Sequence, residues 1–157
     1  TKFGEIKIRF YPDDAPRHVE NLINLIKMGF YDGTTFHRVV RDFMIQGGGM
    51  TPDMNEKQTA APIQNECRNG LKNERGSIAM ARTDDPNSAT SQFYINLVDN
   101  EFLNPSANNP NGYAVFGKVI SGMDVVDAIA TVSTGTKGFH EDVPNEPVLI
   151  QKAKVKG

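Results

Sequence analysis

The sequence predicts a mainly β protein with an antiparallel sheet that is closed or nearly closed, accompanied by two helices. Apolar and polar residues alternate over residues 4–11, which is typical of a strand with one buried face. Several later runs are short and rich in β-branched and aromatic residues, as strands are. Only two segments show helical spacing of apolar residues. Many short strands with few helices favour a sheet that closes on itself and leaves no exposed edge.

The first helix follows the first strand. Its apolar residues recur three and four positions apart, at Val19, Leu22, Ile23 and Ile26. Asp13 or Asp14 can cap its start, and Pro16 is tolerated in the first turn. Gly29 is expected to end it.

The remaining elements are read in the same way. Residues 31–35 form a turn, and residues 51–61 are polar and predict a surface loop. A second, shorter helix is expected over residues 123–130. Further strands are predicted over residues 77–82, 92–97, 115–120 and 148–155.

Composition limits the classes of function. A chain of 157 residues with a net charge of -2 predicts one domain, residues 1–157, and argues against nucleic acid or a membrane as partner. No apolar run is long enough to span a bilayer. We expect a cytoplasmic protein, or a periplasmic one if a leader was removed before Thr1.

The usual catalytic motifs are missing from the sequence. Cys67 is the only cysteine, and the three histidines are far apart with no HExxH pair, so we expect no metal site. Ser88 and Ser91 have no GxSxG context. A pair of carboxylates remains open, although nothing selects two acids from nineteen. Any catalysis should therefore need no strong nucleophile, metal or cofactor.

Residues 36–49 combine fixed charge with apolar surface. Arg38, His37 and Gln46 lie among phenylalanines and a methionine, a mixture that suits an apolar pocket with a few orienting polar groups. The same residues would also suit a half-buried strand pair with a solvent-facing arginine. The glycines at 47–49 lack the spacing of a phosphate loop and are expected to let backbone approach backbone.

The motifs taken together resemble those of the cyclophilins. The matching segments run in order along essentially the whole chain: residues 36–39 (FHRV), 43–48 (FMIQGG), 76–81 (GSIAMA), 91–95 (SQFYI), 102–103 (FL), 113–119 (YAVFGKV) and 122–126 (GMDVV). Residues 81–83, 87–90 and 138–144 resemble the bacterial branch in particular.

This resemblance implies a peptidyl-prolyl cis–trans isomerase that assists folding, on a closed eight-stranded antiparallel β-barrel capped by two α-helices. It implies no cofactor and no metal. The expected partners are proline-containing peptides and flexible or unfolded segments, and we expect a monomer. The reaction fits the missing motifs, because rotation about a conjugated C–N bond makes and breaks no covalent bond.

The resemblance also assigns roles to individual residues. Arg38 would donate a hydrogen bond to the prolyl nitrogen, Gln46 would hold the substrate backbone and orient Arg38, and His37 would support them. The proline pocket and its surroundings would be formed by Phe43, Met44, Tyr94 and Leu103, with Phe102 at the rim, Tyr113 and Gln92 alongside, and Ala81, Arg82 and Thr83 offering backbone contacts.

Strand alternation tests part of this assignment without the family. Gln92 and Tyr94 share one face of a strand, and Met44 and Gln46 share a face of another. Phe43 joins that face only if the chain bends near Asp42. His37 alternates with Arg38, which favours a structural hydrogen-bonding role for His37.

Two residues depart from common members of the family. Phe102 stands where tight cyclosporin binders have tryptophan, and the chain has no tryptophan. The missing indole N–H predicts weak cyclosporin binding with catalysis largely intact. Tyr94 stands where many members have phenylalanine, and its hydroxyl is expected at the pocket edge.

Three hypotheses remain at this point. The first is an active prolyl isomerase. The second is a proline-peptide-binding or chaperone module with incidental turnover. The third is an unrelated small-ligand β-barrel. Arg38, Phe43 and Gln46 are all present, which favours the first.

Overall fold

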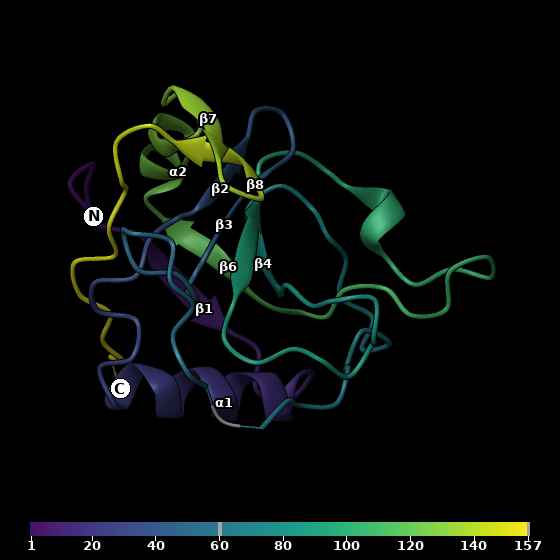
Figure 1. Cartoon of the computed structure of the whole chain (residues 1–157). Helices are drawn as coiled ribbons and strands as arrows, with labels where there is room; N and C mark the ends of the chain where they lie inside the picture. The colour runs from purple at the N-terminus through teal and green to yellow at the C-terminus, as the bar shows by residue number, and fades with distance from the viewer. Residues whose placement is uncertain (60, 157) are drawn as a thin grey trace.

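The computed structural model describes residues 1–59 and 61–156, and Figure 1 shows its eight strands, two α-helices and one 3-10 helix. Ala60, within the predicted loop, and Gly157, at the end of the predicted domain, lie outside the described residues. Six strands form one antiparallel sheet in the order β1 (Lys7–Phe10), β6 (Val115–Ser121), β4 (Ser77–Met80), β5 (Phe93–Asn96), β3 (Met44–Gly47) and β2 (Arg38–Val40).

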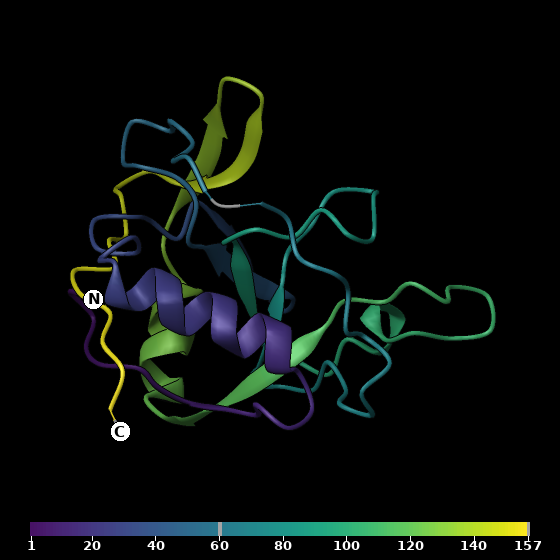
Figure 2. The same cartoon turned by 90° about the horizontal axis from the view of Figure 1, so that it is seen from below.

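The sheet is open within the described residues. Its hydrogen-bonded ladder runs from β1 to β2 and does not return, so the closed barrel that the sequence predicts is not confirmed. A separate antiparallel hairpin consists of β7 (Thr134–Lys137) and β8 (His140–Pro144), and β8 lies beside β2. This hairpin projects from the body of the molecule in Figure 2.

At the carboxyl-terminal side one prediction was wrong and one element was missed. Residues 148–155 do not form a strand; only Leu149 makes an isolated bridge, to Thr35. The hairpin β7–β8 was not predicted, because its strands carry threonine, glycine and charged residues rather than an apolar face. Whether each of these segments forms a strand therefore depends on its tertiary surroundings rather than on its own residues.

The helices lie at opposite ends of the sheet, α1 (Pro16–Lys27) below and α2 (Met123–Ile129) above in Figure 1. Helix α1 buries His18, Val19, Leu22 and Leu25, close to the predicted face. Gly29 follows its C-cap in the left-handed conformation, as predicted. Neither Asp13 nor Asp14 caps the helix. The N-cap residue is Ala15, whose side chain cannot form a hydrogen bond with the first turn.

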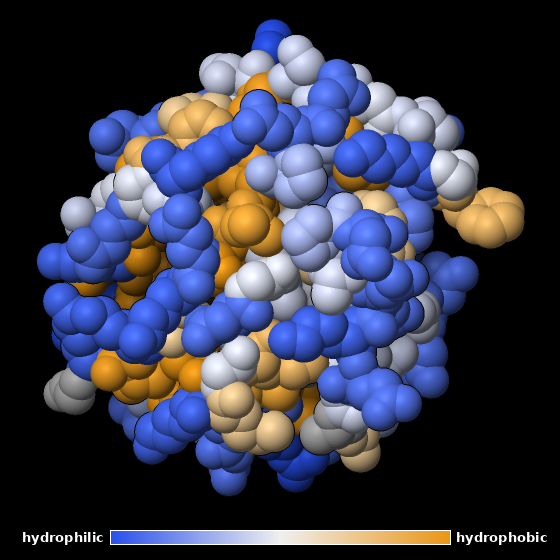
Figure 3. All heavy atoms as spheres, turned by 60° about the vertical axis from the view of Figure 1, so that its left-hand side comes forward, coloured by the Kyte–Doolittle hydropathy of each residue, from blue (hydrophilic) through white to orange (hydrophobic). Residues whose placement is uncertain are grey.

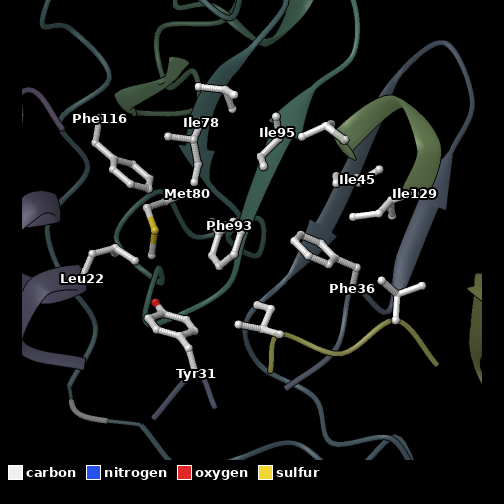
Figure 4. Close-up of a cluster of buried hydrophobic side chains, with 14 of the residues drawn as sticks. Leu22, Tyr31, Phe36, Ile45, Ile78, Met80, Phe93, Ile95, Phe116 and Ile129 are labelled. Atoms are coloured by element: carbon white, nitrogen blue, oxygen red, sulfur yellow. The ribbon is translucent and has the colours of Figure 1, made fainter. Parts of the chain in front are cut away.

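Alternation along the central strands separates two apolar clusters on opposite faces of the sheet. Ile45, Ile78 and Ile95 point into the main core, which α1 and α2 also line. Figure 4 shows Tyr31, Phe36, Phe93 and Phe116 converging in that core. The smaller cluster on the other face consists of Met44, Ala79, Tyr94, Leu103 and Val115, with Phe43, Ala81 and Tyr113 packed against it.

The surface is mixed in character. Figure 3 shows one face on which polar side chains dominate, with apolar side chains visible in the hollows between them, as is normal for folded domains. In the described part of the chain, neither helix is long and apolar enough to cross a membrane.

Candidate active site

A row of paired residues crosses the sheet on the face that carries the smaller cluster. Arg38 in β2 pairs with Gln46 in β3, which pairs with Tyr94 in β5. Tyr94 pairs with Ala79 in β4, and Ala79 pairs with Val115 in β6. Since directly paired residues point to the same face, the sheet register itself brings Arg38 and Gln46 to the edge of an apolar patch.

Arg38 is exposed and is oriented by glutamines. Its Nη1 donates to Gln46 Oε1 over 3.5 Å, a long hydrogen bond, and Gln46 Nε2 donates to Gln92 Oε1 over 3.0 Å. The chain of amides directs Arg38 while leaving its other guanidinium N–H groups available. Gln92 therefore reaches the site through Gln46, as well as lining it.

The apolar residues that the sequence assigns to the proline pocket lie together in the smaller cluster. Met44, Tyr94 and Leu103 are buried within the smaller cluster. Phe43 joins them because Asp42 adopts a left-handed conformation with φ of 59°, which provides the bend that alternation requires. The Phe43 ring stacks on Phe102, with centroids 5.7 Å apart.

Phe102 forms the outer rim of the pocket. It lies in the 3-10 helix η1 (Glu101–Leu103) and is 67% exposed, whereas the neighbouring Leu103 is 8% exposed. The loop that follows η1 extends away from the body in Figures 1 and 2. One apolar ring is therefore exposed at the edge of the smaller cluster, and the next side chain is buried within it.

The hydroxyl of Tyr94 does not face the pocket edge, contrary to the sequence prediction. Tyr94 is 4% exposed, and its hydroxyl donates to Asn73 Oδ1 over 2.7 Å beneath the pocket. Burial, together with the nearby Tyr113, raises the pKa of Tyr94 well above its ordinary value. The ring alone remains to contact a ligand.

The opposite wall is formed around Arg82 and Tyr113. The Arg82 guanidinium lies over the Tyr113 ring, 4.4 Å from its centroid, and Arg82 Nη2 donates to the carbonyl oxygen of Asn111 over 2.5 Å. The amides of Ala81 and Thr83 already donate to Gln92 O and Ser88 Oγ. Backbone contacts to a substrate would therefore involve the carbonyl groups of this segment or the Arg82 amide.

His37 lies away from the groove. It is 6% exposed and its ring approaches His140 of the β7–β8 hairpin, with centroids 6.5 Å apart. Burial, His140 and Arg38 lower the pKa of His37 to about 4, so its imidazole is neutral at neutral pH. Its Nδ1 has no hydrogen-bond partner among the described residues, so the structure gives no support to the hydrogen-bonding role predicted for it.

Gly47 allows backbone to approach backbone, as predicted, whereas Gly49 allows the close approach of a side chain. A Cβ atom on Gly47 would lie 2.6 Å from the carbonyl oxygen of Thr35. A Cβ atom on Gly49 would lie 2.5 Å from Cγ of Gln92. Both distances are too short for any other residue, so the position of Gln92 beside Gln46 depends on glycine at 49.

The sequence did not indicate the buried asparagines behind the pocket. Asn73, Asn96 and Asn100 are each at most 4% exposed and are linked to Tyr94 and Phe43 by hydrogen bonds. Their spacing along the chain carries no periodic signal. No cluster of three or more histidine, cysteine, aspartate or glutamate side chains suited to a metal ion occurs in the part of the chain that the structure describes.

Fold and site define a class of protein: an antiparallel β domain with an apolar cluster on one face of its sheet and one oriented, exposed arginine at the edge of that cluster. The family model described as cyclophilin type peptidyl-prolyl cis-trans isomerase/CLD matches residues 1–155. The chain belongs to this family, and it is a peptidyl-prolyl cis–trans isomerase.

Individual relatives agree with the family match. Peptidyl-prolyl cis-trans isomerase cyp18 of Streptomyces antibioticus is 56% identical over 159 residues, covering 100% of this chain and 96% of its own. Peptidyl-prolyl cis-trans isomerase B of Escherichia coli strain K12 is 53% identical, with 99% and 96% covered. A Cryptosporidium parvum cyclophilin-type isomerase, crystallised in the presence of the dipeptide Ala-Pro, has a TM-score of 0.81 at 26% identity, with 96% and 91% covered.

Proposed function

We propose that Arg38 is the catalytic residue and that it donates a hydrogen bond to the prolyl nitrogen in the twisted transition state. The barrier is rotation about a partial double bond, about 18–20 kcal/mol, and the uncatalysed step takes on the order of tens to hundreds of seconds. A donor that localises the nitrogen lone pair weakens the conjugation and lowers this barrier. The bond accelerates the reaction because it is stronger to the twisted amide than to either planar isomer.

The observation that carries this proposal is the position of Arg38 beside Gln46 at the edge of the apolar cluster that includes Met44, Tyr94 and Leu103. A guanidinium stays charged at all physiological pH values and presents several N–H groups in a fixed plane. Gln46 holds that plane before substrate arrives, so little orientation remains to be achieved during the reaction. A proline ring seated on the apolar floor would bring its nitrogen towards this cation.

The other residues bind rather than react. Phe43, Met44, Tyr94 and Leu103 would hold the proline ring, with Phe102 covering it from the rim. Gln46 would also hold the substrate backbone. No covalent intermediate forms, and neither His37 nor any other group needs to exchange a proton.

The ligands we propose are proline-containing peptides and flexible or unfolded protein segments. An apolar cluster with an exposed ring and an exposed arginine at its edge suits an extended chain with proline at its centre. We expect a monomer, because the proposed mechanism requires no residue from a second chain. We expect only weak binding of cyclosporin, because Phe102 at the exposed rim cannot donate a hydrogen bond.

Replacing Arg38 by alanine tests the mechanism. We expect kcat/KM on a short X–Pro peptide in a protease-coupled assay to fall about 100- to 1000-fold, the usual cost of one preorganised donor. Arg9→Ala is the matched control, because Arg9 is an exposed strand arginine in β1 at the other edge of the sheet. Its rate should equal that of the wild type.

Peptide binding separates catalysis from simple holding. An NMR titration with the same peptide should show that Arg38→Ala still binds, because the apolar pocket is intact. Equal catalytic rates for Arg38→Ala and wild type would remove Arg38 from the mechanism. Binding of the peptide by both proteins with rates near that of the uncatalysed reaction would instead favour a binding module in which turnover is incidental.

A further inference from the structure

A cluster of buried polar side chains lies directly behind the proposed proline pocket. Asn73, Ser77, Asn96 and Asn100 are each at most 5% exposed. Burying amides is costly unless each polar atom finds a partner. Their bonding pattern therefore shows what the cluster holds in place.

Asn73 is the centre of this cluster, and its side chain is fully bonded. Its Oδ1 accepts from the Tyr94 hydroxyl over 2.7 Å and from Asn96 Nδ2 over 3.1 Å. Its Nδ2 donates to Asn104 Oδ1 over 3.0 Å and to the Tyr113 carbonyl oxygen over 3.4 Å. Since a carbonyl oxygen only accepts, the amide has one satisfactory orientation, and both lone pairs and both hydrogens are used.

The partners of Asn73 belong to separate walls of the pocket. Tyr94 is on the floor in β5, Tyr113 is on the wall beside Arg82, and Asn104 is the C-cap of η1, which carries Phe102 and Leu103. The backbone of Asn73 binds the same region, since its N–H donates to Asn104 Oδ1 over 2.7 Å.

A fourth wall is linked through Asn100. The Asn100 N–H donates to the Asn73 carbonyl oxygen over 2.8 Å, and Asn100 Nδ2 donates to the Phe43 carbonyl oxygen over 3.0 Å. These segments are separated by tens of residues in the chain, and no other described residue bonds to so many of the walls. Loss of Asn73 would leave Tyr94, Asn96 and Asn104 without a shared partner.

We propose that Asn73 is a positioning residue of the isomerase, which sets the shape of the proline pocket before substrate binds. It fixes the Tyr94 ring through the hydroxyl, a link that phenylalanine at this position cannot make, and fixes η1 through Asn104. The inference rests on the proposed assignment of the pocket. Preorganisation of this kind lowers the cost of ordering the pocket around the proline ring, so it acts on substrate affinity.

The test compares Asn73→Ala and Tyr94→Phe with Ser77→Ala as the matched control. Ser77 belongs to the same cluster, since its hydroxyl accepts from Asn96 and donates to the Glu74 carbonyl oxygen, but among the described residues its side chain makes no hydrogen bond to Phe43, Tyr94, Tyr113 or η1. The steady-state kcat and KM for an X–Pro peptide are measured well below each thermal midpoint. Under these conditions a purely structural residue leaves both constants of the folded enzyme unchanged.

We expect Asn73→Ala to raise KM about tenfold with kcat within about twofold, since loosened walls weaken ground state and transition state alike. Tyr94→Phe should raise KM about threefold, because only the link to β5 is lost. Ser77→Ala should lower the thermal midpoint by several degrees and leave KM and kcat at wild-type values.

A wild-type KM in Asn73→Ala together with a lowered thermal midpoint would overturn the proposal and assign Asn73 to stability alone. If Asn73→Ala does not fold, the test rests on Tyr94→Phe. A wild-type KM in Tyr94→Phe would then overturn the proposal. Arg38→Ala is measured alongside. Full activity of Arg38→Ala would contradict the proposed mechanism but would leave the effect of Asn73 on KM measurable.

Discussion

Arg38 and His37 are adjacent in sequence and have opposite surroundings. Arg38 is exposed at the groove, whereas His37 is 6% exposed and faces Lys137, Val143 and Pro144 near the β7–β8 hairpin. Burial keeps the His37 imidazole neutral, with a pKa of about 4. A neutral, buried imidazole is not an effective acid at neutral pH, which agrees with a mechanism that needs no proton transfer.

The lowered pKa of His37 predicts a loss of stability in mild acid. An unfolded chain binds a proton at His37 below its ordinary pKa of 6.5, whereas the folded chain binds it only near pH 4. Between these values the unfolded state binds more protons, so the free energy of unfolding falls as the pH falls. The contribution is about 3 kcal/mol between pH 7 and pH 4.

Urea denaturation of wild type and His37→Leu at pH 7, 6, 5 and 4 measures this contribution. The variant should lose about 3 kcal/mol less than wild type over the range. His18, whose pKa burial also lowers, contributes in the same direction but equally in both proteins. The carboxylates of Asp53 and Asp127 have lowered pKa values, so their contribution to the free energy of unfolding is lost only below about pH 4. Parallel pH curves for the two proteins would contradict the burial of a neutral His37.

Phe102 predicts the response to cyclosporin. Its exposed ring offers apolar contact but no donor, so wild type should bind cyclosporin weakly. Phe102→Trp adds one N–H at the rim and should tighten binding about tenfold, the value of one good hydrogen bond. Calorimetric titration measures both proteins, with Phe139→Trp as control, because Phe139 is fully exposed at the hairpin tip. Equal affinities for wild type and Phe102→Trp would reject this explanation.

Residue-level predictions succeeded where strand alternation controls direction. The period of two places Met44 with Gln46 and separates Tyr94 from Phe93, and a single bend at Asp42 accounts for Phe43. Tyr94 shows the limit of this reasoning, since alternation assigns the ring to a face but does not locate the hydroxyl. That position depends on Asn73, which is 21 residues away in sequence.

At the scale of elements, the apolar spacing of α1 is visible in its own sequence, whereas the group that caps the helix comes from a distant part of the chain. Glu66, from a distant loop, accepts from the backbone N–H groups of Arg17 and His18 over 3.3 and 2.8 Å. The same carboxylate also accepts from His18 Nδ1 over 2.5 Å. Three donors at the positive end of the helix are therefore satisfied by one acidic side chain.

Glu66→Ala should destabilise the protein by about 1–3 kcal/mol, because it leaves the two helix N–H groups and the buried His18 without their acceptor. Urea unfolding at pH 7 measures the change. Asp14→Ala is the control, since Asp14 is exposed and does not cap the helix, and it should change stability by less than about 0.5 kcal/mol. A larger loss of stability for Asp14→Ala than for Glu66→Ala would contradict capping by Glu66 and support the cap that the sequence predicted.

The errors among the elements share one physical cause. The helices and the strands β1, β4, β5 and β6 were predicted because their apolar periodicity is local. The hairpin β7–β8 and the segment around Leu149, which bonds to residues 33–36 without forming a strand, depend on which partner is close enough to bond, and that information lies in other parts of the chain. The cap that Glu66 provides at the start of α1 also depends on a distant part of the chain, so the sequence of the helix alone does not predict it.

At the scale of the whole molecule, one sheet serves two purposes. Its inner face carries the main core with Ile45, Ile78 and Ile95, and its outer face carries the pocket with Met44 and Tyr94. Neighbouring residues of the same strands therefore divide stability and function between them. Strands that are held firmly by the core provide a rigid floor for the pocket.

This arrangement predicts a gradient of local stability across the molecule. Every residue of β4 and β5 is buried, and both strands are paired on two sides. The β7–β8 hairpin is a two-stranded sheet with alternating exposed residues, and hairpins of this size are marginal alone. Backbone amides in β4 and β5 should therefore exchange with solvent deuterons only through global unfolding, and those in the hairpin through local opening.

Hydrogen exchange followed by NMR tests this gradient and the closure of the sheet together. We expect hairpin amides to exchange at least about 100-fold faster than those of β4 and β5, with little dependence on added denaturant. Amides of β2, which pairs on one side with β3, provide the internal comparison for an edge strand. Hairpin protection equal to that of β5 would contradict the prediction. It would show that the contact between β8 and β2 includes hydrogen bonds that join the hairpin to the main sheet in solution.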